Sequence, residues 1–223
     1  MLSMLLAMAV DPGALLATYN RPDAAGVSIL VRRDGQTLFR RSYGLADVEA
    51  KRAATPQTNY RLASISKQFT ATAILTLVQE KRIQLDDPIA TYLPGLPPGI
   101  TVRHLLAHQS GLADYENHLP PGEFQVKDAE VLAILRQLPD LLTPPSTKYA
   151  YSNSGYSLLA LLVEKITGQR YADALRERVL KPAGMLRSVA HEDGRDTRRR
   201  ASLRLRRGRH ATHGPKPHQR RIG

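Results

Sequence analysis

The sequence changes character near residue 187, and this change limits how much of the chain can fold around an apolar core. Residues 190–223 contain no aromatic residue and only three large aliphatic residues, Leu203, Leu205 and Ile222. Such a segment cannot bury enough apolar surface to offset the entropy that is lost when it becomes ordered. We therefore expect a folded domain over residues 1–187 and a basic, disordered tail over residues 188–223.

The positive charge of the chain is concentrated in this tail. Residues 187–223, which are the tail and Arg187 just before it, hold twelve Lys or Arg and three acidic residues, and so contribute +9 to the chain's net charge of +12. A segment with this charge attracts polyanions at low salt. Because it has no aromatic side chains to stack on bases, we expect non-specific polyanion binding and no specific nucleic-acid partner.

The N-terminal segment allows two interpretations. Residues 1–10 are apolar and contain Ala7-Met8-Ala9, which has the small-x-small pattern of a cleavage site, but no basic residue precedes this short run. The segment is either the first part of an amphipathic helix that ends near Tyr19 or a degenerate export signal, so the location of the protein is not established. No apolar run approaches the roughly 20 residues of a membrane-spanning helix. The chain has no cysteine, which excludes disulfides and thiolate chemistry.

Hydrophobic periodicity predicts a β-hairpin followed by a series of helices. Apolar and polar residues alternate on both sides of Asp34-Gly35, which predicts a hairpin at 26–44 with a tight turn. Further along the chain, apolar residues recur at helical spacing, and Asp87 and Thr101 are suited to cap the helices that follow them. The predicted helices span residues 65–80, 88–92, 102–108, 128–138, 153–167 and 171–180.

Ser64 and Lys67 form a Ser-x-x-Lys motif at the predicted start of a helix. Positions i and i+3 lie on the same face of a helix, so the lysine amine can reach the serine hydroxyl. A serine needs such a nearby base to become an effective nucleophile, and a helix N-terminus also stabilises a developing oxyanion. The motif occurs by chance in chains of this length, so by itself it predicts little.

The segment Tyr151-Ser152-Asn153 is the second group that can carry chemistry. A phenol beside an ammonium group can act as a general base, because the cation favours the phenolate. The amide of an asparagine can hold a substrate carbonyl or orient a lysine. The alternative is that Tyr151 packs against its neighbours and that Asn153 caps the next helix.

Together and in this order, three segments resemble the serine β-lactamase, D,D-peptidase and esterase family, and class C β-lactamases in particular. YRLASISKQF and the residues after it, over 60–94, resemble the active-site serine helix. TVRHLLAHQSGL, at 101–112, resembles the downstream loop, and KYAYSNSGY and the residues after it, over 148–185, resemble the Tyr-x-Asn segment with its helices. The resemblance covers about residues 12–187. It implies an α+β fold, with an antiparallel sheet flanked by helices and an all-helical region.

The family resemblance also implies roles for individual residues. Ser64 would be the acylated nucleophile, Lys67 and Tyr151 would share the base role, and Tyr151 would protonate the leaving group. Asn153 would bind substrate or position Lys67. The resemblance implies a serine hydrolase that acts on β-lactam, peptide or ester substrates, needs no cofactor or metal, and is usually periplasmic or secreted. For His108, in the loop that borders the cleft, we expect a structural role.

One motif of the family is not found in this sequence. The family carries Lys-Thr-Gly or His-x-Gly on a late strand, whereas His213-Gly214 lacks the intervening residue. The resemblance therefore predicts a C-terminally truncated member, through a reading-frame change or gene truncation, without the last three of five sheet strands. The late strand also supplies an oxyanion-hole donor, and loss of one such donor costs about 2.7–4 kcal/mol in well-studied hydrolases. The alternative function is thus a catalytically inactive homologue.

Overall fold

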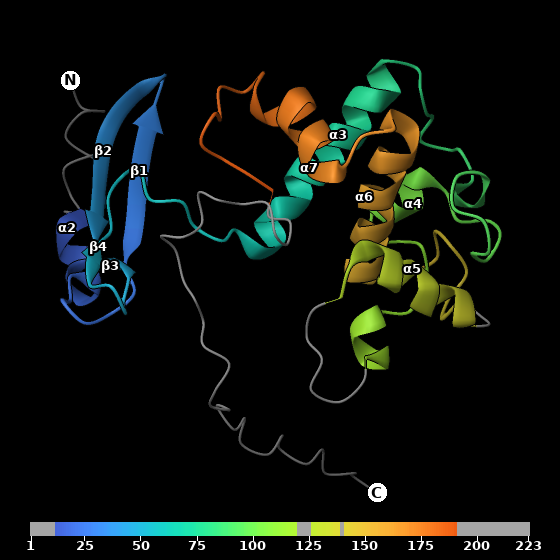
Figure 1. Ribbon diagram of the computed structural model, residues 1–223, viewed down its shortest axis with the longest axis horizontal. Helices are drawn as coiled ribbons and strands as arrows, with labels where there is room; N and C mark the ends of the chain where they lie inside the picture. Colours follow the sequence, from blue (N-terminus) through green and yellow to red (C-terminus); the bar gives the residue numbers. More distant parts are fainter. Residues whose placement is uncertain (1–11, 120–125, 139–140, 191–223) are drawn as a thin grey trace, which may run out of the picture. The chain divides into compact units, whose positions relative to one another are not determined.

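A computed structural model describes residues 12–119, 126–138 and 141–190, which belong to two units. Unit 1 comprises the described residues up to Thr58 and contains the strands, whereas unit 2 begins at Asn59 and is helical (Figure 1). All but the first three residues of the predicted tail lie outside the described residues. The first eleven residues of the chain, with the predicted export signal and the first part of the predicted helix, do so as well.

The main feature of unit 1 is an antiparallel hairpin of β1 (Val27–Arg33) and β2 (Gln36–Tyr43), which confirms the hairpin predicted at 26–44 (Figure 1). Asp34 and Gly35 form its turn, with φ of +50° and +78°. Two successive positive φ values are typical of type I′ turns, whose twist matches that of the flanking strands. The Asp-Gly pair therefore sets the register of the hairpin.

Short elements complete the described part of unit 1. Strand β3 (Leu45–Asp47) pairs antiparallel with β4 (Arg52–Ala53) in a separate two-stranded sheet. The region predicted as one helix up to Tyr19 contains only the single turn α2 (Pro12–Leu15) and the 3-10 turn η2 (Ala17–Tyr19) in its described part. The strands of the described residues are thus confined to unit 1.

Unit 2 contains helices close to the predicted ranges, and α3, α5 and α6 agree with the predictions at 65–80, 128–138 and 153–167 to within two residues. The helix predicted at 171–180 is divided between α7 and a π-helical turn. The elements are η3 (Ala63–Ser66), α3 (Lys67–Gln79), η4 (Ile89–Thr91), α4 (Val102–Leu106), η5 (Tyr115–His118), α5 (Asp128–Gln137), α6 (Asn153–Thr167), α7 (Tyr171–Leu175) and the π-helical η6 (Arg176–Leu180).

The two predicted capping residues behave differently. Thr101 caps α4 as predicted, because its Oγ1 accepts a hydrogen bond from the amide of His104 at 3.4 Å, while His104 Nδ1 accepts from the amide of Thr101 at 3.2 Å. Asp87 does not cap the turn that follows it. Its carboxylate instead accepts hydrogen bonds from the amide of Gln84 at 2.8 Å and from the hydroxyl of Tyr92 at 2.7 Å.

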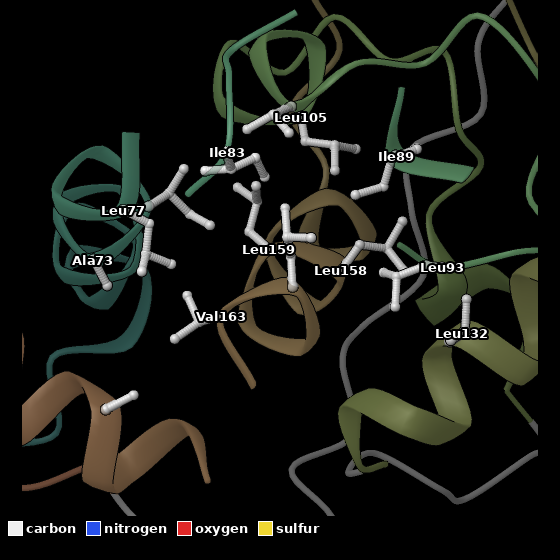
Figure 2. Packing of buried hydrophobic residues seen from close by; sticks show 14 of the residues in the cluster. Ala73, Leu77, Ile83, Ile89, Leu93, Leu105, Leu132, Leu158, Leu159 and Val163 are labelled. Atoms are coloured by element: carbon white, nitrogen blue, oxygen red, sulfur yellow. The ribbon is translucent and has the colours of Figure 1, made fainter. Parts of the chain in front are cut away.

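Helix α6 forms the centre of the apolar core of unit 2 and contacts α3, α4 and α5. Leu159 and Val163 lie on its side facing Leu77 of α3, and Leu158 lies toward Leu93 (Figure 2). All of these side chains are buried, and complete burial of each contributes about 1.5–3 kcal/mol. Among the helices in the described ranges, none combines the length and apolarity needed to cross a bilayer.

A pair of leucine substitutions tests this core. Leu158 is 0% exposed and Leu75, on α3, is 49% exposed. We expect Leu158→Ala to lower the free energy of unfolding by about 2–5 kcal/mol, because it leaves a cavity among packed side chains. Leu75→Ala should change it by no more than about 0.5 kcal/mol. Urea unfolding followed by circular dichroism measures both values, and equal losses would contradict the assignment of α6 to the core.

Candidate active site

Ser64 lies in a 3-10 turn that leads directly into a long helix. It belongs to η3, and α3 begins three residues later at Lys67. The residue before it, Ala63, has a φ of +45°, a left-handed conformation that is costly for a residue other than glycine. This geometry directs the chain into the helix and leaves Ser64 exposed. The Nζ of Lys67 lies 3.5 Å from Ser64 Oγ, so the two motif residues share one helical face as predicted.

Tyr151 and Asn153, far along the chain, meet the same two side chains. The hydroxyl of Tyr151 donates a hydrogen bond to Ser64 Oγ at 2.7 Å. Lys67 Nζ donates to Asn153 Oδ1 at 2.6 Å and lies 4.7 Å from the centroid of the Tyr151 ring. The structure therefore brings together all four of the predicted site residues.

A buried serine fixes the turn that carries Tyr151 and Asn153. The Oγ of Ser152 accepts a hydrogen bond from the amide of Gly155 at 3.1 Å and so caps α6. The alternative interpretation, in which Asn153 is the capping residue, is therefore wrong. Because α6 is anchored in the core, Tyr151 and Asn153, on either side of Ser152, are attached to a rigid helix end.

Two acidic residues in the loop between α4 and α5 also contact Asn153, and the sequence analysis did not identify them. Asn153 Nδ2 donates to Glu116 Oε1 at 2.9 Å, and the backbone amide of Asn153 lies 3.4 Å from Asp114 Oδ2. With its oxygen on Lys67 and its nitrogen on a carboxylate, the asparagine amide has one orientation that satisfies both partners. The buried hydroxyl of Ser154 fixes this loop through two hydrogen bonds to the loop backbone. No spacing pattern in the sequence marks these acids.

The electrostatics of the site favour ionisation of Tyr151. The adjacent Lys67, and after it the hydrogen bond with Ser64, hold the pKa of the Tyr151 phenol below its usual value of 10. Partial burial and the negative charge of Asp114 oppose this shift without reversing it. A phenol with a lowered pKa is better matched to proton transfer near neutral pH.

His108 lies beside Tyr151. Its ring centroid is 4.6 Å from that of Tyr151, and its Nδ1 accepts a hydrogen bond from the amide of Ser152 at 3.1 Å. Loop residues before α6 run against it, since the amide of Ala150 donates to the carbonyl of His108 at 2.8 Å. The position of His108 at the border of the site agrees with the sequence prediction.

The four site residues neither form a metal centre nor line the hollow in unit 1. Within residues 12–119, 126–138 and 141–190, no three His, Asp or Glu side chains converge as metal ligands do. A hollow of about 380 Å³ lies in unit 1, and none of the four site residues lines it. Its lining residues are Ser28, Ile29, Leu30, Arg32, Thr37, Arg40 and Pro56.

Comparison with known proteins identifies relatives of the chain. The family described as Beta-lactamase matches residues 14–221, a range that includes residues assigned above to the tail. A penicillin-binding protein of Bacillus subtilis strain 168 is 35% identical over 167 residues, covering 71% of this chain and 36% of that protein. The D-aminopeptidase of Brucella anthropi is 36% identical over 167 residues, covering 72% of this chain and 32% of that protein. The chain thus spans about a third of the length of these curated relatives.

Solved structures agree with this assignment. The D-amino acid amidase from Ochrobactrum anthropi SV3, complexed with L-phenylalanine amide, superposes with a TM-score of 0.65 and 32% identity, over 78% of this chain and 51% of that chain. The octameric penicillin-binding protein homologue from Pyrococcus abyssi gives a TM-score of 0.64 and 30% identity, over 82% and 43%. These similarities confirm the predicted α+β, β-lactamase-like fold class. The chain belongs to the Beta-lactamase family of serine hydrolases.

Proposed function

We propose that this chain is an acyl-transfer hydrolase in which Ser64 forms a covalent acyl-enzyme. One observation carries the proposal: two potential proton acceptors converge on the Ser64 hydroxyl, Tyr151 at 2.7 Å and Lys67 at 3.5 Å. A serine hydroxyl becomes an effective nucleophile only when a neighbouring group takes its proton. Both acceptors lie within or close to hydrogen-bond reach, as that transfer requires.

The proposed reaction has two steps. Ser64 Oγ attacks the carbonyl carbon of the substrate, and its proton passes to the Lys67–Tyr151 pair. The bond from that carbon to the leaving nitrogen or oxygen breaks, and Tyr151 returns the proton to the leaving group. Water then attacks the acyl carbon and gives a proton to the same pair, which returns it to Ser64 as the carboxylic acid is released. The dipole of α3 stabilises the negative charge that develops beside its N-terminus.

Two protonation states of the pair fit the geometry. In one, a neutral Lys67 amine accepts the Ser64 proton while Tyr151 remains a hydrogen-bond donor. In the other, a Tyr151 phenolate accepts it beside the Lys67 ammonium, and the lowered pKa of Tyr151 favours this state. Because both groups contact Ser64 and Lys67 also lies against the Tyr151 ring, we assign the base role to them jointly.

Asn153 is proposed to position Lys67. Its Oδ1 accepts from Lys67 Nζ at 2.6 Å, while its Nδ2 is engaged by Glu116. Glu116 accepts one of the two N–H donors of Nδ2, which leaves a single donor for substrate, whereas Oδ1 is held by Lys67. Two roles were predicted for Asn153, and its contacts favour positioning of Lys67 over substrate binding.

The proposed substrates are small molecules or peptides with a reactive acyl group. Attack by serine on a carbonyl carbon applies equally to amides, peptides, esters and β-lactams, and the site residues do not choose among them. The relatives are named as a penicillin-binding protein and a D-aminopeptidase, and a structural neighbour as a D-amino acid amidase. We therefore propose amide, peptide and β-lactam substrates for the first assays, with no cofactor.

The third motif of the family bears on the expected rate. Within the described residues, all strands lie in unit 1, and no late strand carries a Lys-Thr-Gly or His-x-Gly sequence. Absence of one oxyanion-hole donor lowers the rate of well-studied serine hydrolases by about 10²–10³. Covalent labelling of Ser64 is consequently a more sensitive test of the site than turnover.

Labelling of the purified chain with a fluorophosphonate and with a labelled penicillin tests the proposal. We expect one adduct on Ser64, identified by intact mass and peptide mapping, and no adduct in Ser64→Ala. Lys67→Ala and Tyr151→Phe should slow labelling by about 10²–10⁴, because proton transfer from the serine is lost. The matched control is Ser66→Ala, which removes a second exposed hydroxyl from the same turn and should label normally. A folded wild-type chain that forms no adduct would instead be an inactive homologue.

The titration of Tyr151 gives a second test. We expect its phenol to lose its proton at a pH below 10, because the lowered pKa arises chiefly from Lys67. Lys67→Met removes the cation that stabilises the phenolate, so the pKa should rise toward 10. NMR of ring-labelled tyrosine, with Tyr151→Phe used to assign the signal, measures both values. An unchanged midpoint in Lys67→Met would show that the lysine does not tune the phenol.

A further inference from the structure

His108 packs against the same two tyrosines that contact Lys67. Its ring centroid lies 4.6 Å from that of Tyr151 at an interplanar angle of 30°, and 5.0 Å from that of Tyr156 at 34°. Lys67 Nζ lies 4.7 Å and 5.5 Å from the centroids of these two rings. Tyr149 adds an edge-on contact with His108 at 5.8 Å. The histidine is therefore part of the cluster of aromatic rings around Lys67.

A hydrogen bond links His108 to the turn that carries Tyr151. The amide of Ser152, the residue after Tyr151, donates to His108 Nδ1 at 3.1 Å. A ring nitrogen accepts a hydrogen bond only when it is unprotonated, so this contact requires a neutral imidazole. The backbone of His108 is held as well, since its amide donates to the carbonyl of Leu105 and its carbonyl accepts from Ala150.

Burial alone does not hold the Tyr151 side chain in place, because 47% of this residue is exposed. A side chain this exposed keeps rotamer freedom unless specific contacts restrict it. The ring of His108, which packs at a tilt against the Tyr151 ring, and the hydrogen bond to the next peptide unit are two such contacts. They act on the tyrosine ring and on the backbone that follows it.

We propose that His108 is a positioning residue for Tyr151, and that its neutral imidazole holds the phenol against Ser64. This inference rests on the function proposed above for Ser64 and Tyr151. The side-chain contacts of His108 are with tyrosine rings and with the amide of Ser152. It therefore acts through Tyr151 and does not itself transfer the serine proton.

The role of His108 has a consequence for the pH dependence of labelling. Burial, and after it the positive charge of Lys67, lower the pKa of His108 below 6.5. The titratable groups that face it are Lys67 on α3, Tyr149 and Tyr151 before α6, and Tyr156 on α6. As the pH falls through this lowered pKa, the ring gains a proton and Nδ1 can no longer accept from Ser152. Labelling should therefore decline in acid with a midpoint below 6.5.

Two substitutions separate the contributions of His108. His108→Phe keeps an aromatic ring and removes the acceptor, whereas His108→Asn keeps an acceptor oxygen and removes the ring. Asparagine also tolerates the left-handed φ of +56° at this position. We expect each variant to slow fluorophosphonate labelling of Ser64 by about 10- to 100-fold, because displacement of a catalytic group by about 1 Å has effects of this size. His118→Phe, at an exposed histidine, should label at the wild-type rate.

A double-mutant cycle distinguishes positioning of Tyr151 from general support of the fold. In a Tyr151→Phe background the hydroxyl that His108 positions is absent, so His108→Phe should slow labelling little further. The acid decline with a midpoint below 6.5 should also disappear in His108→Phe. A further 10- to 100-fold loss in the Tyr151→Phe background would overturn the positioning role.

NMR titration of Tyr151 tests the same inference without labelling. If His108 holds the phenol beside Lys67 and Ser64, the pKa of Tyr151 should rise toward 10 in His108→Phe and in His108→Asn. A shift in a chain that never labels at Ser64 would support the positioning role and overturn the proposed function. In the other outcome, both His108 variants label Ser64 as fast as the wild-type chain and the Tyr151 titration does not change. That result would support the function and overturn the positioning role.

Discussion

The burial of helix α6 is the constraint on which the candidate site depends. Its apolar side packs against α3, α4 and α5, and the turn immediately before it carries Tyr151. A helix packed this closely cannot shift without opening cavities in the core. Ser64 lies in the turn η3, which leads directly into α3, and Lys67 is the first residue of α3, a direct neighbour of α6. Packing between two helices therefore determines how close Tyr151 lies to the Ser64 hydroxyl.

Polar contacts at the end of α6 add the alignment that packing alone does not provide. The amide of Asn153 lies between Lys67 and Glu116, with its oxygen on the cation and its nitrogen on the carboxylate. Hydrogen bonds to charged groups are stronger than those between neutral groups. This arrangement restrains the lysine amine from one side, while the rings of Tyr151 and Tyr156 restrain it from another.

The sequence predicted those features that depend on regular spacing. The helical period located α3, α5 and α6, and the Asp34-Gly35 pair located the hairpin turn, because both signals are local. The four site residues were found because each belongs to a short motif. Their meeting in space across more than eighty residues came from the order of the motifs and from family resemblance, not from periodicity.

Other features could not be predicted, because they depend on tertiary contacts. Ser152 and Asn153 are both good capping residues, so the sequence alone does not show which one caps α6. Asp87 has a suitable position for a cap, but the amide of Gln84 and the hydroxyl of Tyr92 occupy its carboxylate. Glu116 lies in the short 3-10 turn η5, which has no periodic signal in the sequence, and only the folded chain places it on Asn153.

The two units differ in how much apolar packing each has to stabilise its own fold. Two-stranded hairpins are marginally stable in isolation, and the hairpin of unit 1 leaves Leu30, Val31 and Leu38 exposed. Unit 2 has an apolar core of its own, and every residue of the candidate site lies in it. The contacts that assemble Ser64, from α3 and from the start of α6, therefore use no residue of unit 1. Because these contacts rest on a packed core, the geometry of the nucleophile depends on the stability of unit 2.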